Sequence, residues 1–303
     1  MTETQTAPTT QKSFDLYQQV TDTIIKQLEA GTIPWQQSWV NKNQSFAIPR
    51  NAVTGNHYRG INIVLLWSAN DLKNFTTNEW ASLKQWNSKK QSIRKNEKSS
   101  MIVYTDTFEK EQDGEIKKIP FLKYSRVFNR CQLEGFVEEP TEPTVPVKSL
   151  AEKIDHIEDF VGNTLAEIEH REGGACYIPS QDKIQMPLLE SFIDTKTCKA
   201  TENYYSVLFH ELTHWTGHTK RLDRKIRNKF GDHAYAEEEL IAELGAAFLA
   251  SEFSISTPEK KNHASYIANW LKVLKDNKQF IISAASEASK AVEYMKDKQP
   301  LKF

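Results

Sequence analysis

Apolar residues recur at every fourth position near the start of the chain, which predicts a helix over residues 14–28. Further along, residues 101–108 and 121–128 alternate between apolar and polar in the manner of strands. Asp113-Gly114 between these two segments is a hairpin signal, and a turn is predicted around Thr54-Gly55. The first half of the chain is therefore predicted to be α+β.

A second apolar stripe at helical period runs from Leu150 to Ile168 and predicts a helix that is closed by Gly173-Gly174. Residues 177–186 have the pattern of a short hairpin. Helical periodicity then returns in three stretches, of which the last is predicted to break near Asn277. These stretches are residues 204–216, 236–253 and 260–296. This half is therefore predicted to be mainly helical with a small sheet.

Three prolines among acidic and small residues mark residues 137–148 as an extended linker. A chain of 303 residues has room for two domains of ~100–200 residues each. We therefore predict a disordered tail over residues 1–12, one domain over 13–136, the linker over 137–148 and a second domain over 149–303. The predicted fold class is α+β, with an α+β module followed by a mainly helical domain.

Composition excludes several classes of protein. Hydrophobic residues make up 39% of the chain and charged residues 26%, as in globular proteins. The net charge of -1 means that any attraction to nucleic acid must come from local clusters of charge. Three widely spaced cysteines suggest neither a disulfide framework nor a thiolate zinc site. With a polar N-terminus and no run of ~18 apolar residues, the protein is expected to be cytoplasmic, without a membrane partner.

The strongest motif is the HExxH sequence that begins at His210 and ends at His214. On a helix, these two imidazoles lie one turn apart on the same face, where both reach one Zn²⁺. Glu211 is then placed beside the ion as the general base that takes a proton from water. The alternative is a chance occurrence of three polar residues. Apolar neighbours such as Val207 and Leu208 argue against chance, because they turn this helix face toward the interior.

Zinc needs a third protein ligand if one position is to stay open for catalysis. In the metzincin extension of HExxH this ligand is a third histidine, but Lys220 holds that position here. His218 is a minor alternative, since Gly217 is expected to end the helix before it.

The acidic helix over residues 236–253 offers a better donor. Glu239 and Glu243 share one face of it, and we predict Glu239 as the third ligand and Glu243 as the hydrogen-bond partner of a ligand histidine. The alternative is that glutamates stabilise the helix N-terminus. That reading accounts for Glu237 and Glu238 but not for Glu243.

A basic run in the first half is the candidate nucleic-acid site. Cations that bind phosphates, interleaved with aromatic rings that stack on bases, are what binding of single strands requires. The predicted DNA-binding residues are Arg50, Tyr58, Arg59, Trp80, Lys84, Trp86, Lys89, Lys90, Arg94, Lys95 and Lys98. The alternative is a solvated basic face with both tryptophans in the core. A second basic run over residues 220–229 either extends the DNA surface or solvates an exposed helix, and the second interpretation is preferred.

Several segments resemble the ArdC-like antirestriction proteins of conjugative plasmids. In the second half these are HELTHWTGHTKRLDRK, YAEEELIAELGAAFL and CYIPSQDKIQMP, which resemble the zincin-like metallopeptidase domain of that family. In the first half PRNAVTGNHYRGINIVLL, FTTNEWASLKQW, IRKNEK and YSRVFNRCQLEG resemble its single-stranded-DNA-binding domain, which certain conjugative primases share. One departure is the absence of a glycine among the basic residues 92–98.

The resemblance implies an antirestriction protein that binds single-stranded DNA and protects incoming plasmid DNA from host restriction. Its expected cofactor is Zn²⁺, with Mn²⁺ as a second option, and Glu239 again takes the ligand role. Two ways of protection are expected: the bound module shields the strand or delays its conversion to duplex, or the zincin domain cleaves a restriction subunit. The expected protein partner is a host restriction enzyme subunit or another protein substrate. From the residues alone, Tyr235 is a candidate for polarising the scissile carbonyl. The alternative is a replication or priming accessory whose metal domain is structural or inactive.

Overall fold

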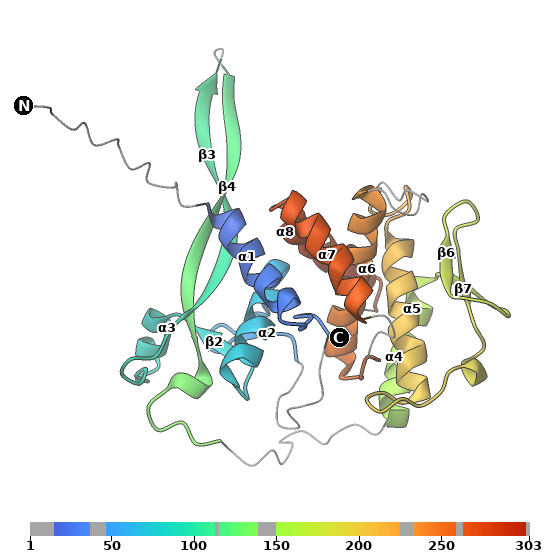
Figure 1. Cartoon of the computed structure of the whole chain (residues 1–303), viewed down its shortest axis with the longest axis horizontal. Coiled ribbons are helices and arrows are strands. Elements are labelled where there is room, and N and C mark those ends of the chain that lie inside the picture. The colour runs from blue at the N-terminus through green and yellow to red at the C-terminus, as the bar shows by residue number, and fades with distance from the viewer. Residues whose placement is uncertain are drawn as a thin grey trace, which may run out of the picture.

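The computed structural model describes residues 15–36, 47–112, 115–138, 150–224, 233–258 and 263–300. Figure 1 shows the first half of the chain in blue and green beside the second half in yellow to red. The fold is mixed α and β, with long helices in the second half and small sheets in both halves, as the sequence predicts. The predicted Asp113-Gly114 turn lies outside the described residues.

The first half is built on a four-stranded sheet in the order β1-β2-β4-β3. Its long antiparallel pair β3 and β4 projects as a ribbon (Figure 1), with Ser100 opposite Val127 at the base. This ribbon confirms both predicted strands and extends them. The elements in chain order are α1 (Leu16–Glu29), β1 (Arg50–Asn51), α2 (Ile61–Lys73), β2 (Glu79–Ala81), α3 (Leu83–Ser88), β3 (Ser100–Gln112), β4 (Glu115–Asn129) and the 3-10 turn η1 (Arg130–Gln132).

The second half surrounds two central helices, α5 and α6, with further helices and a three-stranded sheet in the order β5-β7-β6. The predicted hairpin is present as the antiparallel pair β6 and β7. The elements are α4 (Leu150–Thr164), β5 (Glu167–His170), β6 (Cys176–Ile178), β7 (Lys183–Met186), the 3-10 turn η2 (Leu189–Ser191), α5 (Ala200–Thr216), α6 (His233–Phe253), α7 (His263–Asp276) and α8 (Phe280–Lys296).

The helices differ from the sequence prediction in two places. The helix predicted to include Ile168 ends at Thr164, because Leu165 adopts a left-handed backbone with φ of +60° and the chain then enters β5. Ile168 therefore belongs to the apolar pattern of a strand. The buried helix α2 has no sequence prediction, since apolar residues occupy most of its faces and hide the helical period.

The two halves pack against each other through a continuous apolar core. The largest cluster of buried side chains includes residues of α1 and α2 together with residues of α6, α7 and α8. Polar contacts cross the same boundary: Thr21 Oγ1 donates to the carbonyl of Lys278 (2.7 Å), and the Gly60 N–H donates to Ser289 Oγ (2.8 Å). The first half is therefore held directly against the helices of the second. Most of the predicted linker lies outside the described residues, and the domain boundaries stay a prediction.

Across the described ranges, none of the helices combines the length and the apolar composition that crossing a lipid bilayer requires.

Candidate metal centre and nucleic-acid face

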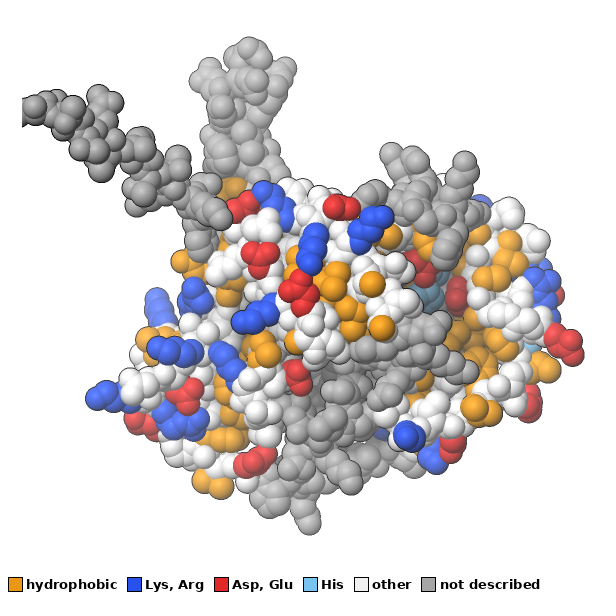
Figure 2. Space-filling view, viewed as in Figure 1, with side chains coloured by type: hydrophobic (Ala, Val, Ile, Leu, Met, Phe, Trp, Pro, Cys, Tyr) orange, Lys and Arg blue, Asp and Glu red, His pale blue; other side chains and the backbone are white. Residues whose placement is uncertain are grey.

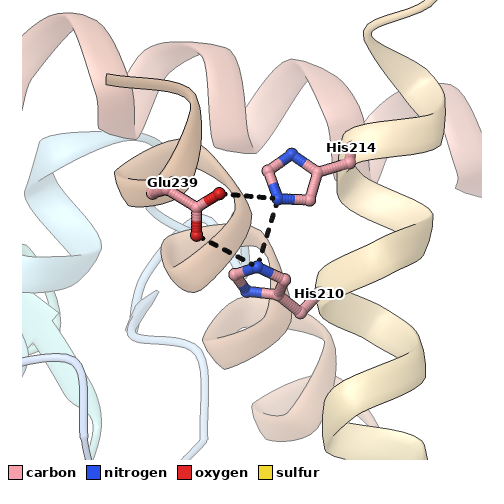
Figure 3. A group of neighbouring side chains, drawn as sticks. All are labelled: His210, His214 and Glu239. Carbon is pink, nitrogen blue, oxygen red and sulfur yellow. Dashed lines mark hydrogen bonds and ion pairs between the residues drawn. The ribbon is translucent and has the colours of Figure 1, made fainter. Parts of the chain in front are cut away.

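The HExxH motif lies on α5, which ends at Thr216 with Gly217 as its C-cap, as predicted. His210 and His214 face each other on one side of this helix, with their Nε2 atoms 3.1 Å apart (Figure 3). Both rings are mostly buried. A helical spacing of four residues therefore brings two metal-binding nitrogens to a single point.

Glu239 of α6 completes the group. Its two carboxylate oxygens lie 3.6 Å from His210 Nε2 and 3.5 Å from His214 Nε2 (Figure 3). Within the described ranges, these three side chains are the set of metal-binding type whose ligand atoms all fall within 4.8 Å of one another. Three ligands of a tetrahedral zinc at ~2.0–2.1 Å lie ~3.3 Å from one another. The donor set therefore fits a divalent cation in both chemistry and spacing.

A glycine permits the close packing of α6 on α5. A Cβ added to Gly245 would lie 2.5 Å from Thr213 Oγ1 and 2.6 Å from Thr213 Cγ2, which is closer than side chains tolerate. The small residues Ala242 and Ala246 flank this position, but the tightest contact is at Gly245. This contact lets Glu239 reach the histidines across the two helices.

The hydrogen-bond partner of a ligand histidine is Glu238, which the sequence interpretation assigned to the helix terminus. The Nδ1–H of His214 donates to Glu238 Oε1 (3.1 Å), which orients Nε2 toward the metal position. Arg224 binds both oxygens of the same carboxylate, at 2.8 and 3.0 Å. Glu243 instead lies 3.7 Å from His210 Nδ1, which is an ion-pair distance and too long for a hydrogen bond.

Two arginines of the second basic run, Arg221 and Arg224, point inward, and the interpretation of the run as a solvated face is wrong for these two. Arg224 holds Glu238, and Arg221 pairs with Asp182 and stacks on the ring of Trp215 at 3.9 Å. Lys220 is exposed, and residues 225–229 lie outside the described residues. His218 is 4.0 Å from Asp182 and is not part of the metal group. His218, the minor alternative for the third ligand, therefore lies apart from the three-residue group.

Charges in the site favour a cation. Burial alone would lower the pKa of His214, but the hydrogen bond to Glu238 and the adjacent Glu239 carboxylate outweigh it and raise the pKa to about 10. Burial likewise opposes ionisation of Glu239, yet the adjacent His210 and His214 imidazoles hold the pKa of this carboxyl well below its usual range. The carboxylates thus stabilise a positive charge at this point, which either a proton or a divalent ion supplies.

Glu211 is buried beside the histidines and is fixed by the sheet. The backbone N–H of Tyr177 on β6 donates to Glu211 Oε2 (2.7 Å), so the strand orients the carboxylate. A cavity of about 410 Å³ opens next to it and is lined by His210, Glu211 and Glu239 among others. Burial, followed by the charge of nearby Glu239, raises the pKa of Tyr235 to about 12.

The predicted basic run is an exposed face around α3. Figure 2 shows Lys and Arg side chains gathered over this end of the molecule. The side chains of Lys84, Lys89, Lys90, Lys95 and Lys98 are exposed, and no ion pair to them is present among the described residues. We call these five lysines the α3 basic face. The predicted arginines are exposed but paired: Arg50 with Glu79, Arg59 with Glu293 and Arg94 with Glu97.

The aromatic part of the DNA prediction is wrong in its choice of residues. Trp80 is fully buried against Phe75, and Trp86 is 3% exposed with its indole N–H donating to the carbonyl of Phe128. Both rings belong to the core, where burial of a large apolar surface outweighs a place at the surface. Tyr58 is half-buried. The two tryptophan rings are therefore not available for stacking on bases, and Tyr58 is only partly exposed.

An exposed aromatic that the sequence interpretation missed lies on the ribbon. Tyr124 of β4 is 44% exposed, and the Arg126 guanidinium lies 5.3 Å from its ring centroid. Burial lowers the pKa of Lys73, the Glu97 charge opposes this shift, and the nearby Arg126 charge adds to it. The signal was present in the strand alternation, which places Tyr124 and Arg126 on one face of the strand.

Comparisons with known proteins agree with this architecture. Residues 14–128 match the N-terminal domain of the anti-restriction factor ArdC, and residues 155–287 match a zincin-like metallopeptidase family. The crystal structure of the antirestriction ArdC protein from plasmid R388 in its metal-free form superimposes with a TM-score of 0.76 at 38% identity, covering 94% of this chain and 98% of that one. Its Mn(II)-bound structure gives 0.75 at 35% identity with the same coverage.

Two relatives extend the comparison. The uncharacterized protein y4eC of Sinorhizobium fredii is 33% identical over 300 residues, which span 96% of this chain and 94% of that protein. The DNA primase TraC of Escherichia coli is 33% identical over 298 residues, which span 92% of this chain but 27% of the primase. The zincin-like domain and the Mn(II)-bound relative support a divalent metal at the site without determining which ion. Both halves thus match one family, and the chain belongs to the ArdC antirestriction proteins.

Proposed function

We propose that this protein is a metal-dependent peptidase joined to a single-stranded-DNA-binding domain, and that it protects incoming conjugative plasmid DNA from restriction in the cytoplasm of the recipient cell. The observation that carries the peptidase part is the convergence of His210, His214 and Glu239 on one point, with Glu211 and an open cavity beside it. These are the parts that hydrolysis by an activated water needs.

In this proposal His210, His214 and Glu239 bind the ion, Zn²⁺ or Mn²⁺. When bound, the ion supplies a Lewis acid that polarises a peptide carbonyl and activates water. Glu211 takes the water proton with the carboxylate oxygen that Tyr177 does not bind, and then delivers it to the leaving amine. In this proposal the Tyr235 hydroxyl, close to Glu239, donates a hydrogen bond to the carbonyl oxygen.

The surrounding charges support these roles. Arg224 and Glu238 hold the His214 ring with Nε2 toward the ion, and Glu243 provides a negative charge near His210. All of these groups are on α5, α6 or the segment between them. The site is therefore rigid before substrate arrives, which lowers the cost of assembling the transition state.

The test of the peptidase is Glu211→Gln in the metal-loaded protein. Loss of the general base should reduce hydrolysis of a denatured protein substrate by about 10²–10⁴-fold while metal content stays the same. Glu190→Gln, an exposed glutamate of η2, is the matched control and should keep full activity. If conjugative transfer into a restricting host is equally well protected by Glu211→Gln, protection does not proceed by proteolysis of a restriction subunit.

The nucleic-acid part rests on the α3 basic face, whose five exposed lysines form a positive patch on a nearly neutral protein. Tyr124 and Arg126 are the base-stacking pair in this proposal, replacing the buried Trp80 and Trp86. Gel shifts with a single strand and with the matching duplex test it. Tighter binding of the single strand, weakened by salt, supports the proposal, and equal binding of both forms contradicts it.

A second function is favoured by the match to part of a DNA primase. In that reading the chain is a replication or priming accessory, and the metal group is structural or inactive. The two readings differ for Glu211→Gln. An accessory keeps its effect on transfer in this variant, whereas a peptidase loses it.

A further inference from the structure

A short segment of the first half forms one wall of the metal cavity. Ile33, Trp35 and Gln36 follow α1, and they line the same cavity as His210, Glu211 and Glu239. Gln36 Nε2 donates to the carbonyl of Pro258 (3.0 Å), which fastens this segment to the opposite wall. The cavity is therefore completed by two parts of the chain that are more than two hundred residues apart in sequence.

Much of the lining away from the metal group is apolar. Among the described lining residues beyond the ligands and Glu211, Glu243 is the one charged side chain, and aliphatic groups make up much of the walls. They include Ile33, Val207, Ala246, Ala247 and Pro258. A cavity of about 410 Å³ with these aliphatic walls and carboxylates accommodates one large apolar side chain and disfavours an anionic one.

Polar atoms at the rim of this cavity lack partners within the described structure. Trp35 Nε1, Gln36 Oε1 and Thr257 Oγ1 are each buried without a hydrogen bond, and all three residues line the cavity. Trp35 is 3% exposed. Buried polar groups normally find partners, so a cluster of unsatisfied ones beside an open space indicates that a ligand supplies them after a small adjustment of the wall. One donor, one acceptor and one hydroxyl suit the amide groups of a peptide backbone.

We infer that this cavity is the subsite for a large apolar side chain next to the scissile peptide bond, and that Ile33, Trp35 and Gln36 make substrate choice depend on the first half of the chain. The inference rests on the proposed peptidase function and names its substrate class. Ile33 sets the depth available to the side chain. The indole N–H of Trp35 binds a backbone carbonyl of the same peptide, and the Gln36 side-chain carbonyl accepts a backbone N–H.

The test measures binding rather than turnover, in the full chain loaded with Zn²⁺. Three hydroxamates serve as probes: acetohydroxamate, a succinyl hydroxamate with an isobutyl side chain and an alanine amide, and the same compound with a benzyl group in place of isobutyl. Wild type should bind the isobutyl probe at least tenfold more tightly than acetohydroxamate, because the side chain buries apolar area in the cavity. Calorimetric titration gives all three dissociation constants.

Ile33→Ala should enlarge the subsite and change the ratio of isobutyl to benzyl affinity by about tenfold in favour of benzyl. Ile25→Ala, the same substitution at a buried residue of the first half that does not line the cavity, is the matched control and should leave that ratio unchanged. Trp35→Phe keeps the ring and removes the N–H, so it should weaken both substituted probes about fivefold. Trp80→Phe also removes an unpaired indole N–H, outside the cavity, and should have no effect.

The outcomes separate this inference from the proposed function. If acetohydroxamate fails to bind, the metal site itself is refuted and the subsite with it. If acetohydroxamate binds but the isobutyl side chain adds no affinity, or Ile33→Ala leaves the ratio unchanged, the subsite is refuted while the metal site stands. An unchanged affinity in Trp35→Phe would overturn the assignment of its N–H to the peptide.

Discussion

The metal centre and the α3 basic face differ in how their charges are satisfied. At the metal centre, Glu238, Glu239 and Glu243 each lie within about 4 Å of a histidine or arginine nitrogen, and the side chains are largely buried. On the basic face, five lysines extend into solvent without ion pairs among the described residues. The metal centre therefore depends on the exact positions of a few side chains, so loss of one should have a large effect. The basic face depends on the summed attraction of several lysines for phosphate, so loss of one or two should have a smaller effect.

The comparison predicts the largest effect for removal of one metal ligand. His214→Ala removes one of the three metal-binding side chains and also removes the hydrogen bond between the imidazole and Glu238. Affinity for Zn²⁺ should fall by more than ~100-fold, beyond what is typical for loss of an orienting group. Competition with a chromophoric chelator measures this. His218→Ala, four residues further on, should bind metal as wild type does, and metal loss in that control would contradict the assigned ligand set.

A smaller effect is expected from the orienting carboxylate. Glu238→Gln keeps the shape of the side chain but weakens its hold on both His214 and Arg224, so Zn²⁺ affinity should fall by about 10–100-fold. Glu237→Gln is the matched control on the preceding residue, whose carboxylate accepts from Ser283 instead. Equal affinities in the two variants would show that the buried pair does not orient the ligand.

On the basic face the effect should be graded. Lys89→Glu combined with Lys90→Glu removes two cations, so the slope of log affinity for single-stranded DNA against log salt should become shallower by about 1.4. Filter binding over a range of salt concentrations measures it. Charge reversal at Lys220 in the other half, and Trp80→Phe in the core, should leave the slope unchanged. A slope that does not respond to the double variant would exclude this face from the DNA site.

The smallest effect is expected at the ion pair between the largely buried Arg221 and Asp182, which lies outside the metal group. The Arg221 guanidinium, with a hydrogen bond from Tyr177, lowers the pKa of Asp182 despite partial burial. A carboxyl with a lowered folded-state pKa stabilises the protein above its unfolded pKa of about 3.9, and this contribution disappears as pH falls through the folded value. Asp182→Asn should therefore cost about 1 kcal/mol at pH 7 and progressively less below pH 4 in urea unfolding. Asparagine tolerates the left-handed backbone of Asp182, so strain does not confuse the result.

Local sequence determined much of this protein. The spacing of His210 and His214 was sufficient to place two imidazoles on one helix face, because the helical repeat is a property of the backbone. The same holds for the β3–β4 ribbon and for the break between α7 and α8, where alternation and the end of a helical period were visible in the chain. The family resemblance added the pairing of a zincin-like domain with an N-terminal DNA-binding domain.

Tertiary structure decided the rest. Glu238, Glu239 and Glu243 have similar sequence environments, and only the approach of α6 at Gly245 determines which of them meets Nδ1 and which meets Nε2. Trp80 and Trp86 lie in the core because burial of their apolar area stabilises the fold. The basic run around them in the sequence does not show whether these rings are buried or exposed. The contribution of Ile33 and Gln36 to the metal cavity depends on packing between segments distant in sequence, which no local pattern encodes.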